Sequence, residues 1–556
     1  MMEIIKGANI FILTLFVFLF SGLPIFRLFQ IKDWLLSRVL ADYFHLRGRK
    51  YILNKKDLLV ILILFVYFIF PKIFFQIFYI FGLVFLGFAE FFSLFELNPF
   101  NLFIFLLLFP LIFLRRNILK TIKITPKALI LFSIFFFLNF LFIYLAYIFH
   151  DFNYFFILYL FLLISYTQIF LFSLALSLFD LMVSPYLFYL RERVKNKLKN
   201  LNIKKIVIVG SYGKSTTKEF LNHLLKDKKI FSLPPRINHE YAIFKYLLKN
   251  SLQGFEYLIL ELGSYFLGNV RWVCKGIIPD FVFITGITKQ HYFLFGENIK
   301  NIIYGEGIEA VLEMKKGKVF VNTSHEYFEI LKKEIEKIRK NKEIEIVTYG
   351  KQGDYSYEIL FSSEEKTIFK LNAKGEEHIL ETNLIYPPQI ENLVGAISFV
   401  LEEKILSLEE INEKIKNLKM PKTFLKPIKY KNITIFDDSY NANLKGVLEG
   451  IRFLEKADFE KKIVIFNGIL ELGRETIKIY ENLAKEFSKF DFTLFTDKEE
   501  YKFFKKILKE KAILIKNQKD LDEFLNNLKE RSGIFIFNRF PSHIKLNLEN
   551  EKNSLH

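Results

Sequence analysis

Charge is distributed very unevenly along this chain, and this distribution constrains its fold more than any other feature. Residues 8–26, 128–149 and 152–179 contain no Asp, Glu, Lys or Arg, whereas the second half is rich in Lys and Glu. With 52% hydrophobic and 17% aromatic residues, the chain is too apolar for an ordinary soluble enzyme. The sequence therefore predicts an N-terminal α-helical transmembrane region, residues 1–200, followed by a globular part.

Five segments are long and apolar enough to cross a bilayer, whose core of roughly 30 Å needs about 20 helical residues. They are residues 8–26, 58–89, 98–114, 128–149 and 152–179. The connections 27–56 and 115–127 are rich in Lys and Arg, and basic loops stay on the cytoplasmic side. We therefore expect a multi-pass protein of the inner (cytoplasmic) membrane, with its N-terminus outside and its globular part in the cytoplasm.

The net charge of +18 raises the question of a polyanionic partner. Many of the basic residues flank the apolar segments, where membrane lipid and topology explain them. No nucleic-acid recognition motif accompanies these residues, so we expect no nucleic acid as partner. The single cysteine, Cys274, excludes an intramolecular disulfide framework and a cysteine-cluster metal site.

A phosphate-binding loop is predicted at Gly210–Thr217, with the sequence GSYGKSTT. A β-branched run precedes it and an amphipathic pattern follows, so the order is strand, glycine loop, helix. Glycines let backbone N–H groups surround phosphate oxygens, and the helix N-terminus adds positive potential. Lys214 is placed to reach the terminal phosphates and the Ser215 hydroxyl to hold Mg²⁺. The expected nucleotide-binding residues of the loop are Gly210, Ser211, Tyr212, Gly213, Lys214, Ser215 and Thr216. A glycine turn that binds no nucleotide is the alternative.

Further motifs follow the loop along the chain. They are NHE at 238–240, ELG at 261–263, His291 ahead of FG at 295–296, NLVGA at 392–396 and DDSYNAN at 437–443. In this order and spacing they resemble the Mur ligases, which build the peptide of the bacterial cell wall. The resemblance covers residues 201–556 and is nearest to the ligases that add D-Ala-D-Ala. The segment 437–443 is close to the signature that opens the C-terminal domain of that family.

The resemblance implies an ATP-dependent ligase that uses ATP and Mg²⁺. Its partners would be a muropeptide precursor, nucleotide-linked or lipid-linked, and an amino acid or dipeptide, joined through an acyl phosphate. The implied catalytic residues are Lys214, His291 and Asp438. The implied nucleotide contacts beyond the loop are Asn238, Asn392 and Asp437. The implied metal ligands are Ser215, Glu261, His291 and Glu306.

Three features depart from the family pattern. The lysine that becomes carbamylated in related enzymes has no counterpart in 302–309, where Glu306 or Glu309 stands instead. The arginine near the entry to the C-terminal domain is also absent, and Lys422 is the nearest cation. No domain that would grip a uridine diphosphate precedes the phosphate loop. These departures leave open a lipid-linked or polyglutamate-type substrate, and also a degenerate scaffold that binds ATP without turnover.

Two α/β domains are expected after the membrane part, with the active site between them. The central domain, 201–420, is a phosphate-loop nucleotide-binding sheet with strands at 206–209, 257–261, 281–285 and 318–322. The C-terminal domain, 421–556, is a Rossmann-like, doubly wound sheet with strands at 433–436, 463–466, 492–495, 512–516 and 534–538. The Lys- and Glu-rich runs 331–345 and 501–511 are expected to be solvated helix faces.

Overall fold

The computed structural model describes two ranges of the chain and divides it into two compact units. The described residues are 125–149 and 154–546, except 236, 290, 364, 419–424, 426, 439–442, 470–471, 539, 542–543 and 545. The boundary between the units lies between Pro185 and Tyr186. The predicted spans 8–26, 58–89 and 98–114 lie outside the described residues.

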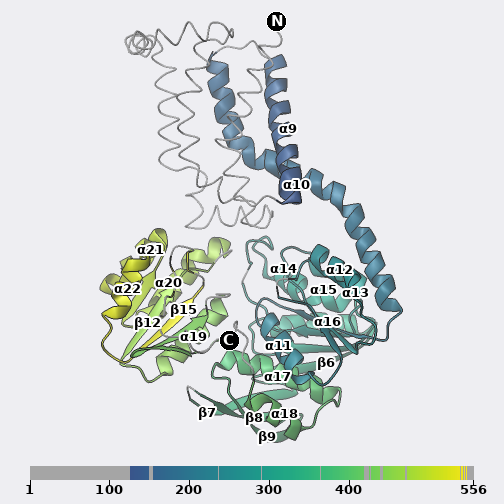
Figure 1. The fold of residues 1–556 in the computed structure, drawn as a ribbon, viewed down its shortest axis with the longest axis vertical. Coiled ribbons are helices and arrows are strands. Elements are labelled where there is room, and N and C mark those ends of the chain that lie inside the picture. Colours follow the sequence, from purple (N-terminus) through teal and green to yellow (C-terminus); the bar gives the residue numbers. More distant parts are fainter. Residues whose placement is uncertain are drawn as a thin grey trace. The chain divides into compact units, whose positions relative to one another are not determined.

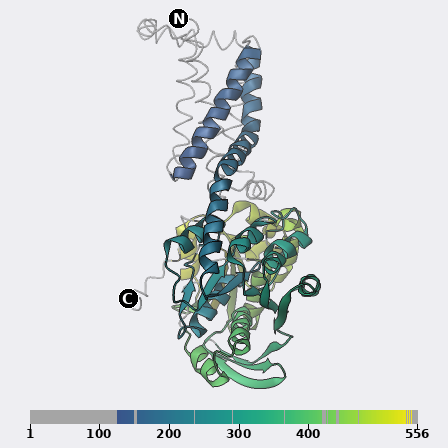
Figure 2. The same ribbon diagram turned by 90° about the vertical axis from the view of Figure 1, so that its right-hand side faces the viewer.

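Two helices represent the predicted membrane part in the described residues. Helix α9 (Pro126–Phe149) lies beside the first part of α10 (Tyr154–Lys199) in both views (Figures 1 and 2). Their packing includes an edge-to-face contact between Phe135 and Phe172, with ring centroids 4.9 Å apart. Helix α10 does not end near residue 179, as the composition suggested, but continues through Pro185 to Lys199.

One described helical stretch, Leu174–Lys199, is long and apolar enough to cross a membrane by length and composition. A shorter apolar stretch, Lys127–Asn139, lies within α9. The multi-span region therefore stays a prediction.

A nine-stranded sheet forms the central domain, in the order β2-β3-β1-β4-β5-β6-β7-β8-β9. Its first six strands in space are parallel and lie at β2 (Ile230–Ser232), β3 (Tyr257–Glu261), β1 (Lys204–Val209), β4 (Phe281–Ile284), β5 (Lys316–Asn322) and β6 (Glu343–Gly350). β7 (Tyr355–Ser362) pairs parallel with β6 over two residues, and β8 (Thr367–Ala373) and β9 (Glu376–Thr382) follow it in antiparallel pairs. The parallel strands alternate with helices, as a doubly wound fold requires.

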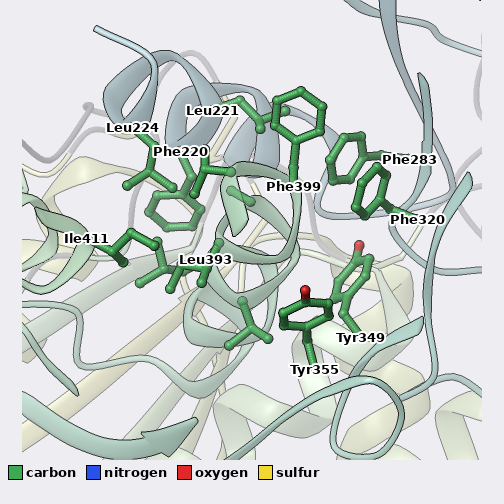
Figure 3. Close-up of a cluster of buried hydrophobic side chains, with 14 of the residues drawn as sticks. Phe220, Leu221, Leu224, Phe283, Phe320, Tyr349, Tyr355, Leu393, Phe399 and Ile411 are labelled. Atoms are coloured by element: carbon green, nitrogen blue, oxygen red, sulfur yellow. The ribbon is translucent and has the colours of Figure 1, made fainter. Parts of the chain in front are cut away.

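Three helices pack on one face of this sheet: α11 (Lys214–Leu224), α17 (Pro387–Glu402) and α18 (Leu408–Lys416). Phe399 of α17 is fully buried, and Figure 3 shows it beside Phe283 and Phe320 of neighbouring strands. The helices that complete the domain are α12 (Glu240–Lys249), α13 (Asn269–Ile277), α14 (Ile299–Ile303), the π-helical turn Tyr304–Ile308, α15 (Glu309–Leu312) and α16 (Phe328–Arg339).

The C-terminal domain is a six-stranded sheet in the order β10-β11-β15-β12-β13-β14. Its strands are β10 (Pro427–Tyr430), β11 (Ile433–Asp438), β12 (Lys461–Phe466), β13 (Phe492–Phe495), β14 (Ala512–Leu514) and β15 (Ser532–Phe537). Its helices are α19 (Leu444–Lys456), α20 (Thr476–Phe487), α21 (Lys498–Leu508) and α22 (Gln518–Asn526). On β15 the phenylalanines face the cluster built on α19, α20 and α21, and the isoleucines face the cluster with α22. Both faces are therefore covered, as predicted for a Rossmann-like sheet.

All nine predicted strands are present, within a few residues of the expected bounds. The run 331–345 is not one helix face, because α16 ends at Arg339 and β6 begins at Glu343. Ile344 and Val347 of β6 are buried, and this apolar pattern favours a strand despite the surrounding charges. The polar strands β7 to β9 were not predicted.

Candidate functional site

The phosphate loop lies between β1 and α11, where the predicted glycines adopt conformations that other residues avoid. Gly210 has φ 130° and Gly213 has φ 77°. A β-carbon on Gly213 would lie 2.5 Å from Oδ1 of Asn392, so the loop packs closely against α17. The backbone N–H of Ser211 donates to the carbonyl of Gly286 at 2.8 Å. The first turn of α11 therefore presents its free N–H groups at the loop, which is an arrangement suited to phosphate.

Lys214 is the first residue of α11, and its Nζ donates to the carbonyl oxygen of Gly210. The ammonium group therefore folds back over the loop that would surround a phosphate. Lys214 also lines the cleft described below.

A carboxylate faces the loop from the end of β3. The pairing of β1 with β3 places Glu261 opposite Ile208, near the start of the loop. The Ser215 hydroxyl donates to Oε1 of Glu261 at 2.7 Å, and Nζ of Lys218 lies 3.3 Å from Oε2. The Lys218 side chain is 3% exposed, so this ion pair holds the carboxylate in place from beneath.

These oxygens suit one Mg²⁺ ion, since Mg²⁺ in phosphate sites takes one or two protein oxygens together with waters and substrate phosphates. Ser215 and Glu261 are already oriented toward each other beside Lys214. Within the described ranges, however, no group of three or more His, Cys, Asp or Glu side chains is arranged to hold a metal ion. The structure is thus consistent with one ion shared with a nucleotide.

Glu306 and His291, the residues predicted to bind a second metal ion, have other contacts than Ser215 and Glu261. Glu306 lies in the π-helical turn, is 2% exposed and accepts a hydrogen bond from the Ser211 hydroxyl. His291 has a left-handed backbone, φ 61°, and its ring stands edge-on to Tyr265 at 6.0 Å. A role for His291 and Glu306 at a second ion stays a prediction.

Glu309 does not lie beside Glu306 on one regular helix face, because the π-helical turn ends between them. Its carboxylate accepts hydrogen bonds from the backbone N–H groups of Gly268 and Arg271. It therefore caps the N-terminus of α13, where a negative charge is favourable. Of the two glutamates considered for the place of the carbamylated lysine, only Glu306 contacts the phosphate loop.

A cleft of about 150 Å³ opens over the loop and is lined by both α/β domains. The central domain contributes Ser211, Tyr212, Gly213, Lys214, Ser215, Thr216, Glu261, Tyr386, Pro388, Gln389 and Asn392. The C-terminal domain contributes Leu425, Asp438, Asn443, Lys445 and Gly446. The prediction of an active site between the two domains is consistent with this lining.

Asn392 lines this cleft with one unsatisfied polar atom. Its Nδ2 donates to the carbonyl of Pro388 at 2.9 Å, while its buried Oδ1 has no hydrogen-bond partner in the structure. A buried acceptor without a partner is costly, and a bound donor such as an adenine amino group would satisfy it. Asn238 and Asp437 are not among the cleft-lining residues. The Asn238 carbonyl instead accepts from the N–H of Gly263, beside the end of β3.

Asp438, at the end of β11, is a cleft-lining carboxyl group with a strongly raised pKa. Burial, reinforced by the neighbouring Asp437, raises the pKa of Asp438 to about 7. A carboxyl group with a pKa near neutrality can accept and release a proton under working conditions, and this suits a general base toward an incoming amine.

The raised pKa of Asp438 predicts a pH-dependent stability. Between its ordinary pKa of 3.8 and about 7, the folded chain binds more protons than the unfolded chain, so the free energy of unfolding falls as pH rises. From pH 5 to 7, at about 1.4 kcal/mol per pH unit while Asp438 is fully protonated, wild type should lose about 2 kcal/mol relative to Asp438→Asn, because the group is already half deprotonated at pH 7. Urea unfolding of both full-length chains without nucleotide measures this difference. A stability difference that is the same at both pH values would contradict the raised pKa.

Several cleft residues were missed by the sequence reasoning. Tyr386, Gln389 and Lys445 carry no recognisable motif, and only the fold brings them to the loop. Asn443 lies within the DDSYNAN signature but was given no role; its side chain caps α19 by accepting from the N–H of Gly446 at 2.9 Å. Lys218 follows Lys214 by one helical turn, and this spacing was the one signal available for it.

Comparison with known proteins identifies the central part of the chain. Residues 208–400 match the family model described as the Mur ligase middle domain. The chain therefore contains a Mur ligase middle domain. The matched range runs from β1 through α17 and contains the phosphate loop, Glu261, Glu306 and Asn392.

Two similar proteins carry the name UDP-N-acetylmuramoyl-tripeptide--D-alanyl-D-alanine ligase. The protein from Haemophilus influenzae is 23% identical over 320 residues, which are 56% of this chain and 67% of that protein. The protein from Borreliella burgdorferi is 25% identical over 297 residues, which are 52% of this chain and 61% of that protein. The matched part of this chain thus spans only about two thirds or less of these relatives.

Two solved structures share its fold. MurF from Acinetobacter baumannii has a TM-score of 0.56 at 20% identity and covers 63% of this chain and 76% of its own. MurF ligase from Thermotoga maritima, solved in complex with ADP, has a TM-score of 0.56 at 21% identity and covers 63% of this chain and 80% of its own. These similarities confirm the predicted α/β fold with its parallel sheet.

Proposed function

We propose that this chain is a Mur ligase, an ATP-dependent amide-forming enzyme of peptidoglycan precursor synthesis. The observation that carries the proposal is the cleft in which the phosphate loop, Lys214 and the Ser215–Glu261 pair face Asp438 of the second domain. One side of this cleft suits a nucleotide triphosphate, and the other offers a titratable carboxyl group. The family match and the names of the similar proteins support the same chemistry.

The reaction begins with transfer of the γ-phosphoryl group. A carboxylate oxygen of the acceptor attacks the γ-phosphorus, the bond to the β-phosphate oxygen breaks, and ADP leaves. Lys214 and the N-terminus of α11 stabilise the negative charge that spreads over the transferred oxygens. When bound at Ser215 and Glu261, Mg²⁺ would add further charge neutralisation there. The product of this step is an acyl phosphate.

Amide formation follows at the acyl phosphate. The amine attacks the carbonyl carbon, the carbon–oxygen bond to phosphate breaks, and inorganic phosphate leaves with one oxygen of the original carboxylate. The amine must lose a proton as it attacks. Ionised Asp438 is the group on the C-terminal side of the cleft that can accept it, because its pKa lies near neutrality.

The proposed substrates are a muropeptide carboxylate and D-Ala-D-Ala or a similar amine, as in the names of the similar proteins. In this proposal the acceptor is carried on a nucleotide. A lipid-linked or polyglutamate-type acceptor remains the alternative for the substrate, because no uridine-gripping domain was found in the sequence. A degenerate scaffold that binds ATP is the alternative for the activity.

Phosphate release from ATP separates these alternatives. The full-length chain is assayed with nucleotide-linked muropeptide, lipid-linked muropeptide and polyglutamate, each with and without D-Ala-D-Ala. We expect release that requires both a muropeptide and the amine. Phosphate release with polyglutamate and not with a muropeptide would indicate a polyglutamate-type substrate. No phosphate release with any combination of acceptor and amine would support the scaffold that binds ATP without turnover.

Glu306 gives a second prediction about this chemistry. If its built-in carboxylate takes the place of the family's carbamylated lysine, turnover should not depend on bicarbonate. Glu306→Gln should then lower kcat by about tenfold or more and raise the Mg²⁺ concentration needed for half-maximal turnover. Glu309→Gln is the matched control, because Glu309 caps α13 and should affect stability rather than the Mg²⁺ requirement. Unchanged turnover and Mg²⁺ dependence in Glu306→Gln would refute this role.

We also propose that the apolar N-terminal part anchors the enzyme in the inner membrane, with membrane lipid as a partner. Its charged connections and the apolar stretch Leu174–Lys199 support this. Reporter fusions at residues 151 and 200 of the full chain should score on opposite sides of the membrane. Fusions that score on the same side would exclude the five-span topology.

A further inference from the structure

Lys445 connects the C-terminal domain to the central domain through three hydrogen bonds, one of which reaches the phosphate loop. It lies in the first turn of α19, and its Nζ donates to Tyr212 Oη at 2.7 Å, to Glu391 Oε1 at 2.9 Å and to the carbonyl of Ser324 at 3.2 Å. The ammonium also lies 4.6 Å from the centre of the Tyr212 ring. A lysine ammonium has three protons to donate, so all three are used within one cluster.

The acceptors of Lys445 belong to a buried network of the central domain. Glu391 of α17 is 4% exposed and also accepts from Nδ2 of Asn322, at 2.6 Å. The same Nδ2 donates to the carbonyl of Thr285 at 2.8 Å, and the Thr285 hydroxyl contacts the carbonyl of Tyr212. The network therefore runs from the C-terminal domain to the backbone of the phosphate loop.

Tyr212 fixes this network to the loop because its ring has little freedom. A β-carbon on Gly286 would lie 2.3 Å from the Tyr212 ring, so the ring lies flat against the backbone there. Tyr212 also stands between Ser211 and Gly213, two residues of the loop that line the cleft. A shift of Lys445 would therefore act on the loop directly.

The position of Lys445 is unfavourable by itself. A cation in the first turn of a helix opposes the helix dipole, and a half-buried lysine loses rotamer freedom. The ion pair with Glu391 and the contacts with Tyr212 offset these costs only while the two domains remain together. An isolated C-terminal domain would gain nothing from a lysine at this place.

We propose that Lys445 is a positioning residue that holds the C-terminal domain against the phosphate loop and so sets the nucleotide-binding geometry of the cleft. This inference rests on the proposed function. It names a contact outside the sequence motifs, since Lys445 and Glu391 belong to none of them. Lys445 also supplies a cation at this domain boundary, where the family's arginine is absent from the sequence.

The kinetic test compares Lys445→Met with Lys456→Met, which removes an exposed lysine from the other end of the same helix. Lys445→Met should weaken binding of a non-hydrolysable ATP analogue and raise KM for ATP by about tenfold. This is the size of effect expected when one or two charge-assisted hydrogen bonds are lost. Lys445→Arg should restore part of this loss, whereas Lys456→Met should change neither value. The double variant Lys445→Met/Glu391→Gln should be no worse than the poorer single variant, because both act on one contact.

A distance measurement tests the contact without relying on turnover. Cys274 is buried, so spin labels can be placed at exposed positions with Lys333→Cys on α16 and Lys485→Cys on α20. In the full-length chain we expect one narrow distance distribution, with a second, longer population in the Lys445→Met background. Tyr212→Phe, which removes a single acceptor, replaces Lys445→Met if the latter does not fold.

The outcomes are distinguishable. A longer population together with weaker nucleotide binding supports the positioning role. An unchanged distance distribution overturns it, and so does a changed distribution with unchanged nucleotide affinity. If wild type binds no ATP analogue, the proposed function fails, while the distance distributions still show whether Lys445 holds the two domains together.

Discussion

Replacing Lys214 with alanine is expected to lower kcat for ATP turnover by roughly 10²-fold or more, the usual cost of removing a preorganised charge at a phosphoryl group. The reason is geometric, because Lys214 begins α11 and its Nζ already lies over the loop at the Gly210 carbonyl. Lys218 cannot replace it, since its ammonium is buried against Glu261. Steady-state phosphate release with saturating substrates measures the effect.

The matched control is Lys226→Ala, which removes an exposed lysine just beyond the end of the same helix. It should leave kcat unchanged and show that lost positive charge alone is not responsible. Turnover in Lys214→Ala equal to that of the control would mean that the loop does not hold the transferred phosphate. The account of the cleft as an ATP site would then fail.

Phe399→Ala is expected to lower the free energy of unfolding by about 3–5 kcal/mol, the range for truncating a fully buried phenylalanine. Phe399 joins α17 to three strands, because its ring centroid lies 6.0, 5.1 and 5.7 Å from those of Tyr257, Phe281 and Phe320. Truncation would leave a cavity under α17, the helix that carries Asn392 and Glu391. Urea unfolding of the full-length chain measures this loss.

Phe361→Ala provides the comparison for that variant, because Phe361 on β7 is 51% exposed. Its effect should stay within about 0.5 kcal/mol, as is usual for a surface position. Equal losses in the two variants would contradict the placement of Phe399 at the centre of the sheet–helix packing.

The sequence predicts the buried parallel strands well, because each is a short apolar run followed by a loop with a functional residue. Glu261 and Asp438 were placed at strand ends on this basis, and both line the cleft. The strands β7 to β9 escaped prediction because polar and apolar residues are mixed along them, so no long apolar run marks them. Edge strands of this kind depend on their neighbours for pairing.

Site residues that contact partners far away in the sequence are harder to predict. Lys445 and Glu391 are 54 positions apart and meet only because α17 and α19 both approach the phosphate loop. Glu306 and Glu309 are only three positions apart, yet Glu306 contacts Ser211 and Glu309 caps α13, because a π-helical turn changes the side-chain spacing. No local pattern of residue types reports either effect.

The most direct test of the proposed ligase follows oxygen rather than phosphate alone. The acceptor is labelled with ¹⁸O at both carboxylate oxygens and incubated with the full-length chain, ATP and the amine. The isotopic content of the inorganic phosphate and of the product is then measured by mass spectrometry. An acyl phosphate intermediate requires one ¹⁸O atom to appear in each phosphate released, together with an equal amount of amide product. Unlabelled phosphate, or ATP hydrolysis that forms no amide, would contradict the account.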